Sequence, residues 1–163
     1  MNGRPLLALG VLLVVAGCGS QYPGNNVGQQ VESWATTSPD PKFAPAMSML
    51  QGDLRRVVAA EASDDASVQR TDCDVLVTDA LSANQNLPTP DGELTNVLSR
   101  AYSAAANAGK DCLCAGGAHT CTAGALGRTG LLKRSAAEGA AARRGFIEAE
   151  ARVDLLSILG GKR

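Results

Sequence analysis

Residues 89–112, TPDGELTNVLSRAYSAAANAGKDC, form the stretch that decides the fold. Apolar residues recur in it every three or four positions, which places them on one face of a helix. That face comprises Leu94, Val97, Leu98, Ala101, Ala105, Ala108 and Cys112. Thr89 is the expected N-cap and Pro90 the first helical residue, with Asp91 and Glu93 near the positive end of the helix dipole. The stretch therefore predicts a long amphipathic helix, and its small alanines let neighbouring helices pack closely.

Two more helices are predicted before this stretch. The first spans about residues 43–62, with an apolar face of Phe43, Met47, Leu50, Leu54, Val57 and Val58. The second follows Ser63-Asp64-Asp65, a typical N-cap with acidic side chains beside the helix start. Its expected face comprises Val68, Cys73, Leu76, Val77, Ala80 and Ala83.

One helix is predicted after the stretch, beginning between Thr122 and Thr129 and running to about Leu159. We expect its core face to comprise Leu132, Ala136, Ala140, Ile147, Ala151, Leu155 and Ile158. Aromatic residues make up only 3% of the chain, so aliphatic side chains and alanine must form the core. Residues 41–160 are thus predicted to form an all-α domain, a small antiparallel bundle of about four helices.

The N-terminus carries an export signal. Arg4 precedes an apolar run, 6–16, that at about 1.5 Å per residue is too short for a bilayer core of roughly 30 Å. The run ends in Val15-Ala16-Gly17-Cys18, which resembles the lipobox of bacterial lipoproteins. The resemblance implies a signal peptide over residues 1–17, cleavage before Cys18, and a diacylglyceryl group with palmitate-type chains on the Cys18 thiol. It also implies attachment to the cell membrane on its extracytoplasmic face, since two acyl chains give stable anchoring.

Residues 18–40, between the lipobox and the bundle, are rich in Gly, Gln, Asn, Ser, Thr and Pro. They show neither a helical nor a strand period, so we interpret them as a flexible tether. Trp34 is the one residue in this segment expected to dock on the domain or to lie at the lipid interface.

The segment from Leu54 to Cys112 resembles a widespread kind of uncharacterised secreted helical protein from actinobacteria. The matching residues are Cys73, the link Pro88-Thr89-Pro90-Asp91 and Cys112. The resemblance implies a helical fold and carries no activity with it. Cys114 and Cys121 depart from that pattern.

Disulfides are the default for the four cysteines that remain after Cys18, because export places them in an oxidising compartment. Four cysteines allow three pairings, of which we favour Cys73 with Cys112 and Cys114 with Cys121. The first pair lies on core faces of adjacent helices, and the second would close a small Gly-rich loop. Cys73 and Cys112 lie at the same height along the bundle only if the Pro-rich link between their helices is extended. A compact link would hold their Cα atoms more than about 7 Å apart.

A metal site is the alternative use of these thiols, with Cys112, Cys114, His119 and Cys121 as ligands. Thiolates and imidazole suit zinc or cuprous copper, but Cys-x-Cys is not a usual zinc spacing. We therefore expect no metal or other cofactor.

Catalysis and nucleic-acid binding are not indicated. The single histidine has no accompanying G-x-S-x-G elbow, and no phosphate-binding loop is present. Without Arg4, 14 of the 15 basic residues face 16 acidic ones, so the domain is nearly neutral. We expect a membrane-attached protein with a binding or structural role toward an envelope protein. The alternative is a carrier of a small ligand or metal, using the 112–121 cluster or a pocket between helices.

Overall fold

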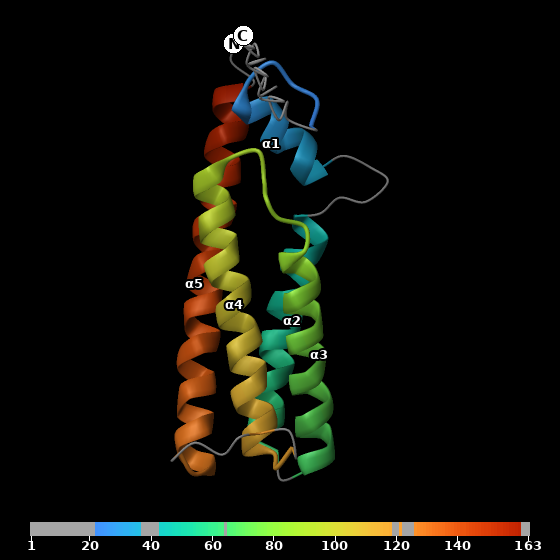
Figure 1. Cartoon of the computed structure of the whole chain (residues 1–163), viewed down its shortest axis with the longest axis vertical. Helices are drawn as coiled ribbons and strands as arrows, with labels where there is room; N and C mark the ends of the chain where they lie inside the picture. Colours follow the sequence, from blue (N-terminus) through green and yellow to red (C-terminus); the bar gives the residue numbers. More distant parts are fainter. Residues whose placement is uncertain (1–21, 37–42, 64, 119–120, 122–125, 161–163) are drawn as a thin grey trace, which may run out of the picture.

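Five α-helices and no strand make up the part of the chain that the structure, a computed structural model, describes. The described residues are 22–36, 43–63, 65–118, 121 and 126–160. The helices are α1 (Val27–Thr36), α2 (Ala44–Glu61), α3 (Ala66–Asn84), α4 (Gly92–Ala115) and α5 (Arg128–Gly160). Helices α2 to α5 stand side by side as an up-and-down bundle, and α1 lies across the C-terminal end of α5 (Figure 1). The predicted all-α bundle is confirmed.

Helix α4 is the centre of the bundle, because it packs between α3 and α5 (Figure 1). Every residue of its predicted apolar face is buried. Alanines supply much of the contact surface: Ala101, Ala104, Ala105, Ala106 and Ala108 are all buried. Small side chains on both sides of α4 let two neighbouring helices approach its backbone closely.

The core face predicted for the last helix is wrong. Its Ile147, Leu155 and Ile158 are exposed, whereas the buried residues of α5 are Ser135, Gly139, Ala142, Phe146, Ala149, Leu156 and Gly160. The inward face is made mostly of small residues that fit against the alanines of α4. At Gly145, a Cβ atom would lie 2.8 Å from the Cβ of Ala101, so the two helices nearly touch there. Closeness of packing, rather than side-chain size, determines which face of α5 is buried.

Helices α3 and α4 also meet at a glycine. A Cβ on Gly109 would lie 2.7 Å from Cγ2 of Val77 and 2.8 Å from the carbonyl oxygen of Cys73. Real Cβ atoms do not approach other atoms this closely, so only glycine fits without a shift of one helix. The contact lies one turn from Cys112, which is bonded to Cys73.

Two of the predicted helix starts differ from the structure in their capping. Asp65 is itself the N-cap of α3, accepting from the backbone N–H groups of Ser67 and Val68, and is not a residue of the first turn as expected; Asp64 lies outside the described residues. Helix α4 begins two residues later than predicted, because the carboxylate of Asp91, not the hydroxyl of Thr89, caps it. The last helix begins at Arg128, within the predicted interval. Two residues placed on core faces, Val58 and Val68, are exposed.

Helix α1 contradicts the interpretation of 18–40 as a flexible tether for residues 27–36. The side chain of Asn26 accepts from the N–H of Gln29 at 3.0 Å, which caps the helix start. Val31 and Trp34 are buried, and the Trp34 ring lies 5.6 Å from that of Phe43. This apolar contact holds the helix on the domain. Residues 18–21 and 37–40 of the predicted tether lie outside the described residues.

Replacing Gly109 with alanine should destabilise the protein by about 1–3 kcal/mol, because the added methyl group forces α3 and α4 apart. Gly52→Ala is the matched control: Gly52 is also helical, and the nearest side-chain atoms to a Cβ placed there are 3.9 Å away. That substitution should stabilise the protein by about 0.5–1 kcal/mol. Urea unfolding followed by circular dichroism measures both. Equal stability of the two variants would contradict the close contact at Gly109.

Candidate functional site

Cys18, the predicted lipidation site, lies outside the described residues together with the predicted signal peptide. In the part of the chain that is described, no helix combines the length and apolar character needed to span a bilayer.

The four remaining cysteines are paired as favoured from the sequence. Cys73 and Cys112 are joined between α3 and α4, with Cα atoms 5.8 Å apart, and both are fully buried. Cys114, in the last turn of α4, is joined to Cys121 beyond the helix end, with Cα atoms 5.4 Å apart, and both are partly exposed. The residues between Asn84 and Gly92 climb far enough along the bundle to bring the first pair level. A disulfide across a separation of 39 residues is worth about 2–4 kcal/mol.

The alternative metal site would need these same sulfur atoms. Cys112, Cys114 and Cys121 are all in disulfides, and a metal binds the thiolate form. His119 lies outside the described residues. Among the residues that are described, no three His, Cys, Asp or Glu side chains are grouped to hold a metal ion. A metal could therefore use the predicted ligands only after both disulfides were reduced.

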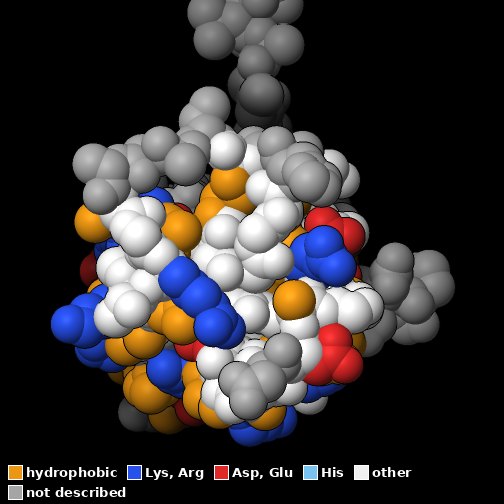
Figure 2. Space-filling model, turned by 90° about the horizontal axis from the view of Figure 1, so that it is seen from below, with side chains coloured by type: hydrophobic (Ala, Val, Ile, Leu, Met, Phe, Trp, Pro, Cys, Tyr) orange, Lys and Arg blue, Asp and Glu red, His pale blue; other side chains and the backbone are white. Residues whose placement is uncertain are grey.

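The end of the bundle that carries Cys114 and Cys121 has dispersed charges. Figure 2 shows Lys and Arg side chains in separate groups among apolar and uncharged atoms, without one continuous basic surface. A hollow of about 290 Å³ on the flank of α4 and α5 is lined by both signs of charge. In it Arg134 makes a two-pronged ion pair with Asp111. These paired charges leave little net field to attract a polyanion.

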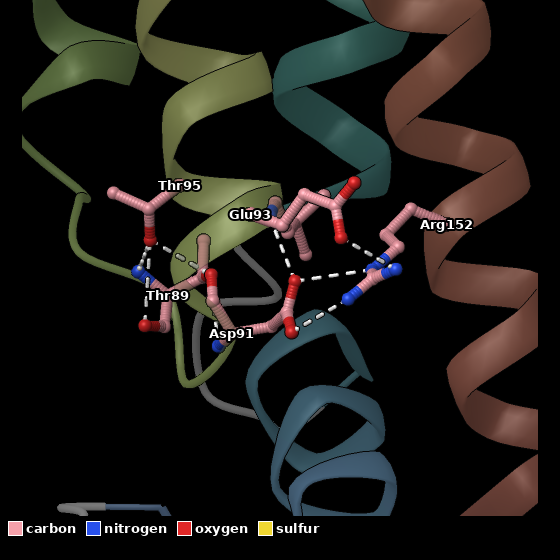
Figure 3. Close-up of polar contacts among 6 residues, drawn as sticks. Thr89, Asp91, Glu93, Thr95 and Arg152 are labelled. Carbon is pink, nitrogen blue, oxygen red and sulfur yellow. Dashed lines mark hydrogen bonds and ion pairs between the residues drawn. The ribbon is translucent and has the colours of Figure 1, made fainter.

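A second polar cluster connects the start of α4 to α5. Figure 3 shows Asp91, at the N-cap, pointing toward Arg152 of α5. Arg152 donates to both carboxylate oxygens of Asp91 at 3.0 and 3.2 Å, and lies 2.8 Å from Glu93. Burial alone would raise the pKa of Asp91, but hydrogen bonds from Arg152 and from the N–H of Leu94 outweigh it and lower that pKa. The arrangement satisfies the helix end and fixes α5, which is a structural role.

A groove of about 210 Å³ lies beside this cluster, between α4 and α5. Val97, Ala151 and Leu155 form its apolar wall, and Glu93, Glu148 and Arg152 its polar rim.

The outer face of α5 is the largest feature for which the sequence-based prediction was wrong. The exposed fractions are 64% for Ile147, 48% for Leu155, 58% for Ile158 and 58% for Leu159. We define the outer face of α5 as Ala136, Ala137, Ile147, Leu155, Ile158 and Leu159, all of them exposed. A sequence signal for it exists, since large apolar residues occur on both sides of this helix and only one side can pack on α4.

A buried carboxyl group between α2 and α3 is a further site that the sequence did not indicate. Asp53 is fully buried beside Asp79, and Arg56 pairs with it. Burial raises the pKa of Asp53 to about 6, with a further contribution from Asp79, while Arg56 opposes the rise. Oδ2 of Asp53 has no hydrogen-bond partner within the described residues. Two ionised carboxylates repel each other, so protonation of Asp53 relieves this repulsion.

Comparison with known proteins identifies no relative. No protein-family model matches the chain, and the searches of curated proteins and of solved structures gave no match. The function must therefore be inferred from the site geometry and the sequence.

Asp53→Asn should remove a pH dependence of stability. The folded-state pKa of about 6 lies above the usual 3.8, so protonated Asp53 favours the fold at low pH and this contribution is lost as pH rises through 6. The amide cannot ionise, so at pH 7.5 the variant should be more stable than the wild type by about 1–3 kcal/mol. Denaturant unfolding at pH 5 and 7.5 measures this. Asp74→Asn, on the exposed side of α3, is the control, and an unchanged pH slope for Asp53→Asn would contradict the assignment.

The two disulfides should differ in their accessibility to reductant. Cys114 and Cys121 are partly exposed, whereas Cys73 and Cys112 are fully buried. Mild reduction of the folded protein followed by alkylation should therefore label Cys114 and Cys121 first, and the buried pair only once the protein unfolds. Peptide mass spectrometry over a reductant series measures the order. Simultaneous labelling of all four cysteines in native buffer would show that the buried pair opens as readily.

Proposed function

We propose that this protein is a lipid-anchored interaction module on the extracytoplasmic face of the cell membrane, with a binding or structural role in the envelope. The observation that carries the proposal is the sequence Val15-Ala16-Gly17-Cys18 at the end of a short apolar run. Such a run is too short to cross a bilayer, and the thiol of Cys18 is a nucleophile suited to carry a diacylglyceryl group.

Two features of the folded domain support this proposal. The remaining cysteines lie within disulfide distance in pairs, which is the arrangement expected of a protein kept in an oxidising compartment. The outer face of α5 exposes several large apolar side chains, which are typical of a surface that binds another molecule.

The carrier alternative has less support. Each of three hollows on the described surface has at least two charged side chains in its lining, whereas pockets for small ligands are mostly apolar and enclosed. The sulfur atoms of the predicted metal site are used in disulfides. We therefore assign no ligand, metal or catalytic residue.

Lipid attachment is tested by growing cells that express the full chain with an alkyne analogue of palmitate. The wild-type protein should become labelled and sediment with membranes. Cys18→Ser should lose the label and retain residues 1–17, because neither lipid transfer nor cleavage can follow. The matched control is Ser20→Ala, two residues away, which should behave as the wild type. Intact mass spectrometry measures both outcomes, and an unlabelled wild-type chain or a labelled Cys18→Ser chain would refute the anchor.

A further inference from the structure

The C-terminal half of α5 has apolar residues on two opposite sides. Phe146 and Leu156 point into the bundle, while Ile147 and Ile158 are exposed. Among the described helices, α4, α1 and, to a smaller extent, α2 make the main contacts with α5, and they lie on its inner side (Figure 1). Large apolar side chains that gather on an exposed face often mark a surface that binds another molecule. The outer face of α5 therefore has the composition of a surface with a partner.

Charges of opposite sign lie on the two sides of Ile147 along the chain. Arg143 and Arg144 precede it, and Glu148 and Glu150 follow it. At 100° per residue, Arg144 and Glu148 lie along one edge of the outer face, and Arg143 and Glu150 along the other. All four are exposed, and none of them forms an ion pair within the described part of the chain; Glu150 accepts one hydrogen bond, from Gln51 at 3.2 Å. Each edge thus carries one unpaired cation and one unpaired anion.

Side-chain size is also arranged about Ile147. Small residues, Ala136 and Ala137, lie ten or eleven positions before it. Large residues, Leu155 and Ile158, lie eight and eleven positions after it. One half of the outer face therefore carries small side chains, and the other half carries large ones.

We propose that a second copy of this chain packs antiparallel on the outer face of α5, about a two-fold axis near Ile147. In such a pair, positions before the axis come to roughly the same level as positions after it, and each edge faces the same edge of the other copy. Arg144 then meets Glu148 of the second copy, and Arg143 meets its Glu150. The half with the large side chains, Leu155 and Ile158, packs on the half of the second copy with the small side chains, Ala137 and Ala136. Charge and size are both complementary only in this antiparallel arrangement, because a parallel pair would place each residue against itself.

A lipid surface fits the outer face less well. The apolar residues from Ile147 to Ile158 extend about 16 Å along the helix, and three acidic residues, Glu148, Glu150 and Asp154, lie within this span. An anionic membrane surface would attract Arg143 and Arg144 but repel these acidic residues, whereas a second copy supplies an opposite charge for Arg143, Arg144, Glu148 and Glu150. The pairing gives the proposed interaction role a partner and does not depend on lipid attachment, because all the groups involved lie on α5.

Reciprocal charge reversals test the pairing in the full chain, extracted and studied in density-matched detergent. Arg144→Glu places glutamates 144 and 148 together across the interface, and Glu148→Arg places arginines together. Each variant alone should dimerise at least about tenfold more weakly than the wild type, because like charges oppose each other. An equimolar mixture of the two should form mixed dimers, in which both contacts are again opposite in charge. Sedimentation equilibrium over a concentration series measures all three samples.

The control is Arg100→Glu, a charge reversal on α4 away from the outer face of α5, which should leave dimerisation unchanged. Circular dichroism checks that every variant keeps its helix content. A wild-type chain that stays monomeric at all concentrations, single reversals that dimerise as the wild type, or a mixture that fails to recover would each refute the pairing. A monomer whose Ile147 and Ile158, replaced by spin-labelled cysteines, enter the acyl region of vesicles would assign the face to lipid instead. The palmitate label on Cys18 measures anchoring separately from sedimentation, so either proposal can fail alone.

Discussion

Close approach of three helix backbones, made possible by alanine and glycine, is the constraint on which the remaining structure depends. Helix α4 presents small side chains to α3 on one side and to α5 on the other. Gly109 admits Val77 of α3, and Gly145 of α5 admits Ala101. Because the backbones are so near, small side chains fill the interior of a core that has few aromatic rings. Dispersion contacts between the closely packed helices take the place of contacts made by large side chains. The buried disulfide between Cys73 and Cys112 is possible for the same reason, since its Cα atoms must lie within about 7 Å of each other.

The sequence was most informative where composition and period agreed. All seven residues of the apolar face predicted for α4 are buried, although Tyr102, Ala104 and Ala106, which were not part of that prediction, are buried as well. On α5 the two criteria conflicted: the large residues, such as Ile147, indicate one face, and the small ones, such as Gly139 and Ala142, indicate the other. Size was the wrong guide, because burial on α5 requires a fit to the alanines of α4. Helix α1 was missed although Asn26 and Gln29 have the spacing of a helix cap, followed by Val31 and Trp34 on one face.

The candidate site was predictable only where it depends on local order along the chain. The pairing of Cys114 with Cys121 follows from a separation of seven residues, and that of Cys73 with Cys112 from the faces of two neighbouring helices. The contact of Arg152 with Asp91 joins residues 61 positions apart, and nothing local marks it. The burial of the Asp53 carboxyl group depends likewise on the packing of two helices. The exposed face of α5 could not be assigned before it was known which side of that helix faces α4.

The seating of α1 on the end of α5 also limits how far the domain can stand from its point of attachment. Residues 18–40 as free chain would have let it range over about 70 Å. With α1 in place, nine residues, 18–26, precede the first helix, and their full extension is about 30 Å. Under the proposed anchoring this distance is shorter than the roughly 50 Å length of α5 itself. The protein would then work at the membrane surface and could not span the envelope. In an antiparallel pair the two attachment points lie at opposite ends. Residues 18–26 of both copies could then reach the membrane only if the helices of the pair lie along its surface.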